Sequence, residues 1–225
     1  MRRTVKLLIS TLLLAICAEA QHPYDTWDEE YSVQALLGVA MFDNLQFKVS
    51  DSLSSDEVDI STLPQVGGAW TTRPSGQRIQ AGLETSFLIG FRGTDLDYLY
   101  LGGGGAKVGL SVRMWMFDLT GGGYLSLFLD PNHRVRLYGG VGPLISYADY
   151  ISERNYSDST PNDSTHDSAL GIGAYARAGV EFRTHKKGLL GLGVRNIWSR
   201  MDFTDLGGAS ELKGIAFFVT YTAGF

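Results

Sequence analysis

Hydrophobic and polar residues alternate one by one along most of the chain beyond residue 30. A period of two is the pattern of a β-strand whose two faces meet different surroundings. Eight segments show this pattern, separated by Gly-, Asp-, Asn- or Ser-rich stretches of the kind found in turns and loops. The segments span about 31–47, 78–92, 106–118, 123–129, 134–150, 168–184, 189–203 and 212–225. We see no convincing amphipathic helix and therefore expect an all-β chain.

The segment 168–184 alternates most regularly. One face carries seven apolar residues at every second position, from Leu170 to Phe182. The opposite face carries small residues together with Tyr175 and Arg177. Two different faces of this length predict a strand that lies between an apolar and a polar environment.

The segment 106–118 divides less clearly. Its apolar face would hold Met114 and Met116, and its polar face would hold Arg113. The run Gly121-Gly122-Gly123 follows, and we interpret it as a turn before the next segment.

Short and long connections alternate along the chain. Asp130-Pro131-Asn132 is a tight-turn sequence, and residues 185–188 are equally short, whereas 48–62 and 152–167 are long, polar and expected to be loops. Residues 63–72 and 94–105 could form further strands, so a barrel of ten strands is the alternative to one of eight.

The polar faces are unusual for a surface in water. They consist mostly of glycine, serine and tyrosine with sparse charges, and 28 of the 225 residues are glycine. The apolar faces are continuous, and several Tyr and Trp residues lie near the segment ends, namely Tyr31, Tyr147, Tyr150 and Trp198. An outward apolar band with aromatic girdles and a polar interior is typical of a closed antiparallel transmembrane β-barrel. A soluble, secreted lipocalin-like ligand binder would point the same apolar faces inward and remains an alternative.

The N-terminus has the pattern of a secretory signal peptide. Residues 1–20 combine a basic start, an apolar stretch and a small-residue site, and we expect cleavage after Ala20. Residues 21–30 would be a periplasmic lead-in, and 31–225 the barrel domain. Cleavage would remove Cys17, the single cysteine, and take the formal net charge from −5 to −7. A mildly acidic exported chain without a basic patch is a poor candidate for nucleic-acid binding.

The mature chain resembles the small bacterial outer-membrane β-barrels of the OmpA/OmpX transmembrane-domain type. The resemblance rests on the signal peptide, the alternating segments and the terminal strand with Phe217, Val219, Tyr221 and Phe225 on one face. It implies a Gram-negative outer membrane as location, with both ends of the mature chain in the periplasm. It also implies contact with outer-membrane lipid and lipopolysaccharide, and assembly by the barrel-assembly machinery, which would recognise those four residues. Ala223 stands where such signals often carry a larger residue.

The predicted lumen contains an excess of arginine. Its polar residues are Glu84, Arg92, Arg113, Arg136, Tyr138, Tyr175, Arg177, Glu181, Arg183 and Arg195. Because an eight-stranded interior is just wide enough for side chains to fill, we favour a plug of paired charges. The expected role is then structural or surface interaction through exposed loops around 48–77 and 152–167. A narrow, porin-like channel for small solutes is the alternative.

We predict no catalytic, cofactor or metal site, and hence no enzyme. His166 has Ser and Asp neighbours, but a Ser/Asp-rich loop contains such neighbours by composition alone. The acidic residues of the loops do not have the spacing of an EF-hand. The oligomeric state stays open.

Overall fold

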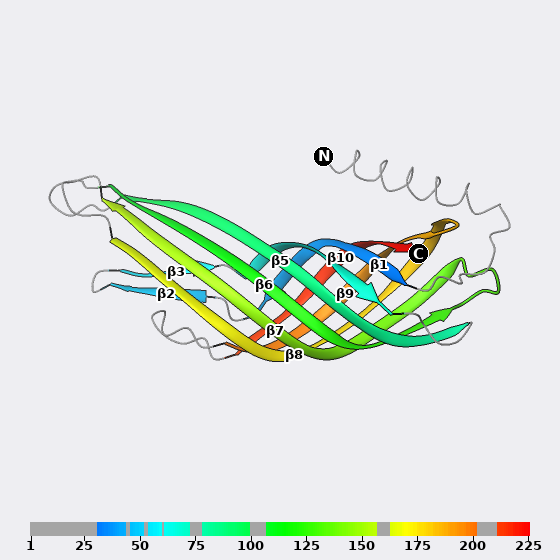
Figure 1. Ribbon diagram of the computed structural model, residues 1–225. Helices are drawn as coiled ribbons and strands as arrows, with labels where there is room; N and C mark the ends of the chain where they lie inside the picture. Colours follow the sequence, from blue (N-terminus) through cyan, green and yellow to red (C-terminus); the bar gives the residue numbers. More distant parts are fainter. Residues whose placement is uncertain are drawn as a thin grey trace, which may run out of the picture.

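Eight strands close a barrel, and two further strands form a separate hairpin. The computed structural model describes residues 31–43, 46–51, 54–59, 61–72, 78–99, 107–156, 163–201 and 211–225. The barrel strands are β1 (Ser32–Phe42), β4 (Thr62–Thr71), β5 (Ile79–Leu99), β6 (Lys107–Phe128), β7 (Val135–Tyr156), β8 (Asp163–His185), β9 (Gly188–Arg200) and β10 (Leu212–Gly224). The hairpin consists of β2 (Gln46–Asp51) and β3 (Ser54–Asp59) (Figure 1). The prediction of a closed eight-stranded all-β barrel is confirmed.

The strand order shows how the barrel closes. It runs β1-β10-β9-β8-β7-β6-β5-β4, every pair is antiparallel, and β4 pairs with β1. Tyr31 and Phe225 exchange two backbone hydrogen bonds of 3.3 and 3.0 Å at the junction of β1 and β10. The last strand therefore has a hydrogen-bonded neighbour on each side, which leaves it no unpaired edge.

The glycine run that we expected to form a turn lies inside β6. Gly123 pairs with Leu83 of β5 and with Val141 of β7, so the two segments predicted on either side of the run belong to one strand, β6. Close packing explains Gly122, since a Cβ there would lie 2.1 Å from the carbonyl oxygen of Val141. The eighth barrel strand is instead β4, which lies in the region 63–72 left open by the sequence.

The polar stretches also contain more strand than predicted. Residues 48–62, expected to be a loop, hold most of β2 and all of β3. The expected loop 48–77 includes the whole of β4, and the expected loop 152–167 contains the end of β7 and the start of β8. Asp, Asn and Ser are common in turns, but hydrogen bonds to neighbouring strands override this local preference.

The barrel wall is higher on one side than on the other. Strands β5 to β8 have 21 to 23 residues, whereas the other barrel strands have 10 to 13. β5 loses its β4 partner beyond Gly90, and β8 has no β9 partner before Ile172. The four long strands therefore continue as a sheet past one end of the barrel (Figure 1). We call residues 91–99, 107–115, 149–156 and 163–171 the projecting sheet; at ~3.3 Å per residue it reaches about 30 Å along the strands.

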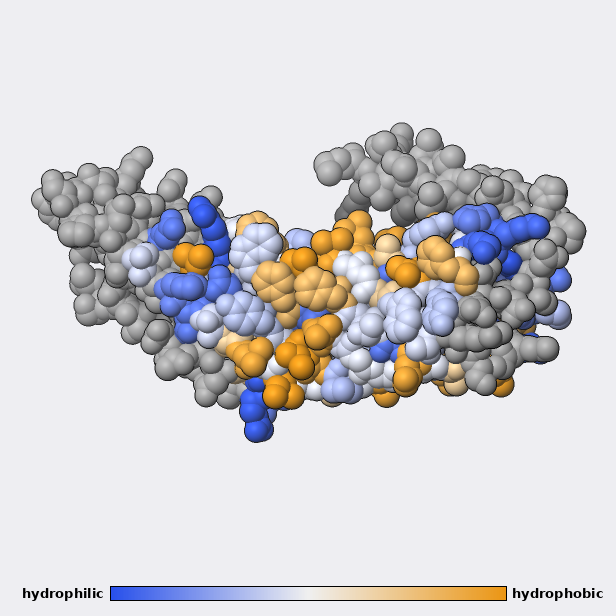
Figure 2. All heavy atoms as spheres, in the orientation of Figure 1, coloured by the Kyte–Doolittle hydropathy of each residue, from blue (hydrophilic) through white to orange (hydrophobic). Residues whose placement is uncertain are grey.

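Where burial is described it alternates along the barrel strands, and the outward face is mostly apolar, although large apolar side chains such as Leu88, Met114 and Phe218 also lie inside. The outward side chains that are more than half exposed include Leu37, Val141 and Leu192. Along β10, buried and exposed residues alternate over most of the strand. Figure 2 shows apolar residues gathered over the middle of the molecule and hydrophilic residues towards both ends. No helix among the described residues is long and apolar enough to cross a membrane.

Candidate functional site

The inward face of the barrel carries three carboxylates and three arginines in direct contact. The carboxylates are Glu84, Asp118 and Glu181, and the arginines are Arg136, Arg177 and Arg195. All six residues are at most 9% exposed. A buried charge is costly unless it is paired and hydrogen-bonded, so the arrangement of these groups determines whether the barrel is stable.

Glu181 of β8 is fully buried, and its two oxygens accept hydrogen bonds from three other strands. Arg136 of β7 donates to Oε2 through Nε at 2.8 Å and also through Nη2. Gln34 Nε2 and the hydroxyls of Thr220 and Thr222 donate to Oε1 at 2.7, 3.2 and 2.6 Å. The carboxylate is therefore fully solvated by protein donors.

Glu84 of β5 lies in a second cluster on the other side of the lumen. Arg177 donates through Nε to Oε1 at 2.9 Å and through Nη2 to Oε2, and the Tyr175 hydroxyl donates to Oε1 at 2.8 Å. Arg177 Nη1 also donates to Gln34 Oε1 at 2.6 Å. Because the Gln34 amide contacts both Arg177 and Glu181, it joins the two clusters into one network that spans the lumen.

Asp118 of β6 forms the third cluster. Arg195 Nη1 donates to Oδ2 at 3.0 Å, and the Ser146 hydroxyl donates to Oδ1 at 2.7 Å. The Arg195 guanidinium also lies 5.6 Å from the centre of the Tyr175 ring, a distance at which cation–π attraction adds to the ion pair.

Aromatic rings fill the space beside these charges. The ring centre of Tyr138 lies 5.2 Å from Cζ of the Arg177 guanidinium. The Tyr138 ring also stacks on Tyr124, with 6.4 Å between the two ring centres. Its ring occupies room that two glycines provide, since a Cβ on Gly179 or Gly193 would lie 2.5 or 2.4 Å from Tyr138. The cavity beside Tyr138 and Arg177 measures about 10 Å³, which is about the space of a single water molecule.

Most of the residues predicted to face the lumen lie inside the barrel. Those that are buried on the inward face are Glu84, Arg136, Tyr138, Tyr175, Arg177, Glu181, Arg183 and Arg195. Arg183 lies near the end of β8 and donates to the Lys186 and Asn132 carbonyls at 2.6 and 3.4 Å. Arg92 is half-buried and donates to the Thr62 carbonyl at 2.6 Å.

The placement of Arg113 in the lumen is wrong. Arg113 is exposed, whereas Met114 and Met116 are buried inside. The assumed turn at 121–123 had separated two parts of one strand, so the faces of the first part were assigned in reverse. Tyr150, expected in an outer girdle, is likewise buried.

Five members of the network were not predicted from the sequence. They are Gln34, Asp118, Ser146, Thr220 and Thr222. Asp118 shares its face with Met114 and Met116, and a carboxylate at that period was the signal that this face is the polar one. The small uncharged residues carry no comparable signal.

The outward face carries aromatic groups at two levels. Phe87, Phe91, Trp115, Phe117 and Tyr147 form a continuous cluster across β5, β6 and β7, with ring centres 4.3 to 6.4 Å apart. At the end where Tyr31 pairs with Phe225, the Tyr31 ring stacks on Trp70 with 5.9 Å between ring centres. Phe217, Val219, Tyr221 and Phe225 are exposed on the outward face of the terminal strand, and their role as an assembly signal stays a prediction.

Solved structures of similar architecture are bacterial outer-membrane proteins. The match to Ail, the attachment invasion locus protein of Yersinia pestis, covers 88% of this chain and 100% of that protein. The two chains are 14% identical, and the TM-score is 0.46. OprG from Pseudomonas aeruginosa covers 88% of this chain and 97% of its own, with 10% identity and a TM-score of 0.45. The match to Neisserial surface protein A covers 87% of this chain and 97% of that protein, with 12% identity and a TM-score of 0.40. No family model and no curated protein matches the chain.

At such low identities and TM-scores the assignment rests on the geometry of the barrel itself. Its strands close completely, its outward face is mostly apolar, and the three carboxylate–arginine pairs described above lie inside. This is the arrangement that lipid requires, because every backbone polar group of a spanning strand must be satisfied by a neighbouring strand. The chain has the fold of the small bacterial outer-membrane β-barrels. The expected resemblance is confirmed at this level.

Proposed function

We propose that the protein is an integral outer-membrane barrel that does not conduct solutes and that presents its projecting sheet outside the cell. The observation that carries the proposal is the network across the lumen. Side chains from β1, β5 and β8 meet through Gln34, Glu84, Arg177 and Glu181, so paired charges occupy the path that a solute would take. The apolar outward band and the paired charges inside support a location in lipid.

The projecting sheet is the feature that supports a role in surface interaction. It extends beyond the level at which β4 and β9 end, and its outward residues change from apolar to polar along β8, from Leu170 to Ser168, His166 and Ser164. Tyr31 and the C-terminal Phe225, which pair with each other, lie at the opposite end. Periplasmic termini would therefore place this sheet outside the cell, where it is available to a partner.

Two measurements test the membrane barrel and its plug. A closed membrane barrel resists SDS until it is heated, so unboiled and boiled samples from an outer-membrane fraction should migrate differently on a gel. In a planar lipid bilayer the purified protein should show no stable channel. Recovery of the protein in the soluble fraction without a heat shift would refute the barrel. Stable conductance, with an ion selectivity that changes in Arg177→Ala or Arg195→Ala, would refute the plug. The barrel would then be a narrow channel that favours anions.

The orientation can be tested with single cysteines, because Cys17 is the sole cysteine of the chain and lies within the signal peptide expected to be removed. Ser164→Cys places a thiol on the projecting sheet, and the control Lys187→Cys places one on the turn between β8 and β9. A membrane-impermeant maleimide should label Ser164→Cys in intact cells. It should label Lys187→Cys only after the cells have been permeabilised. The reverse pattern would refute presentation of the sheet outside.

An enzymatic role receives no support from the described residues. His166 Nε2 lies 2.6 Å from Asp149 Oδ1 on the projecting sheet, but in this part of the chain no hydrogen bond connects His166 to a serine. No group of three or more His, Cys, Asp or Glu side chains suited to a metal ion occurs in the described ranges. A nucleophile needs a positioned base within hydrogen-bond reach, and this pair lacks the nucleophile.

A further inference from the structure

A small cavity lies inside the barrel where the polar network meets apolar side chains. Its volume is about 10 Å³, which is room for one water molecule or one ion of similar size. Leu36, Leu88 and Phe218 line it; they are at most 5% exposed and belong to a buried apolar cluster. Arg177 and Arg195 of the network line it as well. Two charged groups therefore meet a buried apolar space, in which electrostatic attraction is stronger than in water.

The charges around this cavity have one sign. Arg177 of β8 and Arg195 of β9 are direct partners in the strand register, so their side chains start from neighbouring positions on the inward face. Among the described residues that line the cavity there is no aspartate or glutamate, since Glu84 and Asp118, which pair with the two arginines, lie outside the lining. Positive charge without a carboxylate in the lining favours an anion as occupant.

Two nitrogen atoms of Arg195 are hydrogen-bond donors without a partner in the described part of the chain. Nη1 donates to Asp118 Oδ2 at 3.0 Å, but Nε and Nη2 contact no acceptor there, although the residue is 3% exposed. Their N–H groups lie on one edge of the planar guanidinium and point the same way, so a single acceptor can take both. In Arg177 the same edge holds the Glu84 carboxylate. Because buried donors are nearly always paired, this edge of Arg195 indicates an acceptor in the cavity.

The other polar side chains of the lining carry hydroxyls. They are Ser86 and Tyr138, and Ser86 Oγ lies 2.5 Å from Thr120 Oγ1, where either oxygen can donate. When Thr120 donates, the hydroxyl hydrogen of Ser86 is available to an occupant. A water molecule would accept from these donors but would also need acceptors for its own hydrogens, whereas an anion only accepts. The donors of the lining therefore favour a monoatomic anion over water.

From these observations we infer that the cavity is a binding site for one halide ion, which in a cell is chloride. The ion accepts the N–H groups on Nε and Nη2 of Arg195 and lies beside Arg177, so it offsets the repulsion between the two guanidiniums. A polyatomic anion such as phosphate is too large for the space. The inference goes beyond the proposed function, because it assigns a ligand to the interior and makes the stability of the closed lumen depend on it.

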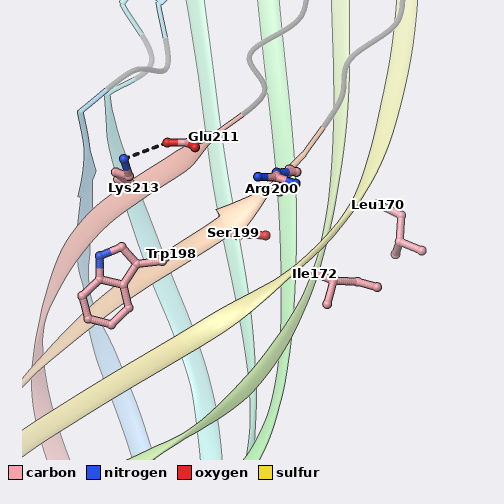
Figure 3. Close-up of a pocket in the computed structure, with 7 residues that line it drawn as sticks. All are labelled: Leu170, Ile172, Trp198, Ser199, Arg200, Glu211 and Lys213. Atoms are coloured by element: carbon pink, nitrogen blue, oxygen red, sulfur yellow. Dashed lines mark ion pairs between the residues drawn. The ribbon is translucent and has the colours of Figure 1, made fainter.

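The outward surface offers an anion a second, weaker place. A hollow of about 620 Å³ lies there beside the end of β9, and Figure 3 shows Arg200, Glu211 and Lys213 among its lining residues. Lys213 Nζ lies 2.7 Å from Glu211 Oε2, and both side chains are about half exposed. Water and salt screen an ion at such a place, so an anion bound there should not stabilise the barrel.

The stability of the full mature chain, folded into lipid vesicles, tests the interior site. Urea unfolding is followed by tryptophan fluorescence in sodium chloride and in sodium gluconate at equal ionic strength, since gluconate is too large for the cavity. Chloride should raise the unfolding midpoint of the wild type. At a chloride concentration one hundred times the dissociation constant, the ratio of folded to unfolded protein should rise about a hundredfold.

Two arginine variants show whether the effect comes from the cavity. Arg195→Lys keeps a positive charge opposite Asp118 but removes the edge with two donors, so it should abolish the difference between the two salts. The matched control is Arg136→Lys, because Arg136 is equally buried and also pairs with a carboxylate but does not line the cavity. Both variants should lose stability, and Arg136→Lys should keep the chloride effect.

Crystals grown in sodium bromide locate the ion directly, because bromide replaces chloride and scatters anomalously. The expected result is a bromide peak inside the barrel beside Arg195. Bromide at the outward hollow alone, or no bromide peak, would overturn the inference and leave the cavity to water. Equal midpoints of the wild type in the two salts would overturn it too, as would an undiminished chloride effect in Arg195→Lys. Each variant is first checked for its heat-dependent gel mobility; if Arg195→Lys fails to fold, the bromide measurement on the wild type decides.

Discussion

Replacing Glu181 by glutamine should destabilise the barrel strongly although it changes a single atom. The substitution keeps the side-chain volume and removes the charge that faces Arg136, a residue 3% exposed. In one orientation the new amide NH2 group would face the two N–H donors of Arg136. If the amide flips, the NH2 group would face the donors of Gln34, Thr220 and Thr222 instead. Either orientation leaves buried donors without an acceptor.

The expected magnitude follows from the burial of the pair. Removing one partner of a buried ion pair costs about 3–5 kcal/mol, because the remaining charge is left without compensation. If this cause is correct, Arg136→Met should rescue part of the loss, since it removes the uncompensated charge itself. The double variant should then be more stable than the sum of the two single losses predicts.

The free energy of unfolding can be measured by urea titration of the barrel folded into lipid vesicles, with tryptophan fluorescence and gel mobility as independent readouts. Glu211→Gln is the matched control, because it removes the same atom from an exposed pair with Lys213 and should leave the unfolding midpoint unchanged. A loss below about 1 kcal/mol for Glu181→Gln would refute the reasoning, since that is the range of an exposed pair. Strictly additive effects of the two substitutions would refute it as well.

Three further outcomes test other parts of the structure. Gly193→Ala should cost about 1–3 kcal/mol because its Cβ would lie 2.4 Å from the Tyr138 hydroxyl, and Tyr138→Phe should restore part of that loss. Gly123→Ala is the control, since no atom lies within 4 Å of a Cβ there, and a similar loss at both glycines in urea unfolding would contradict the packing argument. Phe225→Ala should slow membrane insertion in cells while the purified barrel keeps its heat-dependent mobility; insertion at the normal rate would argue against an assembly signal. Arg113→Gln should leave the midpoint of urea unfolding unchanged because Arg113 is exposed. A loss of stability as large as that caused by replacing a lumen arginine would indicate that Arg113 belongs to the network.

Alternation predicted the architecture well because it is a property of each strand alone. In 168–184 the period of two correctly separated the outward series from Leu170 to Phe182 from the inward Tyr175 and Arg177. The prediction of eight strands was right although two of its parts were wrong. One predicted turn, at 121–123, lies within β6, and one strand, β4, lies in a region left open. Three glycines in a row carry no side chains by which a face could be followed.

Part of the polar network, including Glu84, Arg177 and Glu181, could be predicted as a set of residues, but its contacts could not. Glu181 and Gln34 are 147 positions apart, and their hydrogen bond depends on the register of every strand pair between them. The sequence also gives no measure of how far a strand continues. The four long strands therefore appeared as shorter segments flanked by loops, although backbone pairing with a neighbour extends them through Asp- and Ser-rich stretches.

Strand β8 connects the interior, the lipid-facing wall and the projecting sheet. Its inward residues Arg177 and Glu181 belong to the network, its outward residues Ile172 and Leu170 are exposed on the wall, and residues 163–171 belong to the projecting sheet. The two faces of a strand contact different neighbours, so substitutions on them should act independently. Glu181→Gln should therefore lower the stability of the barrel, whereas Ile172→Ser should leave the midpoint of urea unfolding nearly unchanged. Equal losses for the two variants would show that the interior and the wall are coupled.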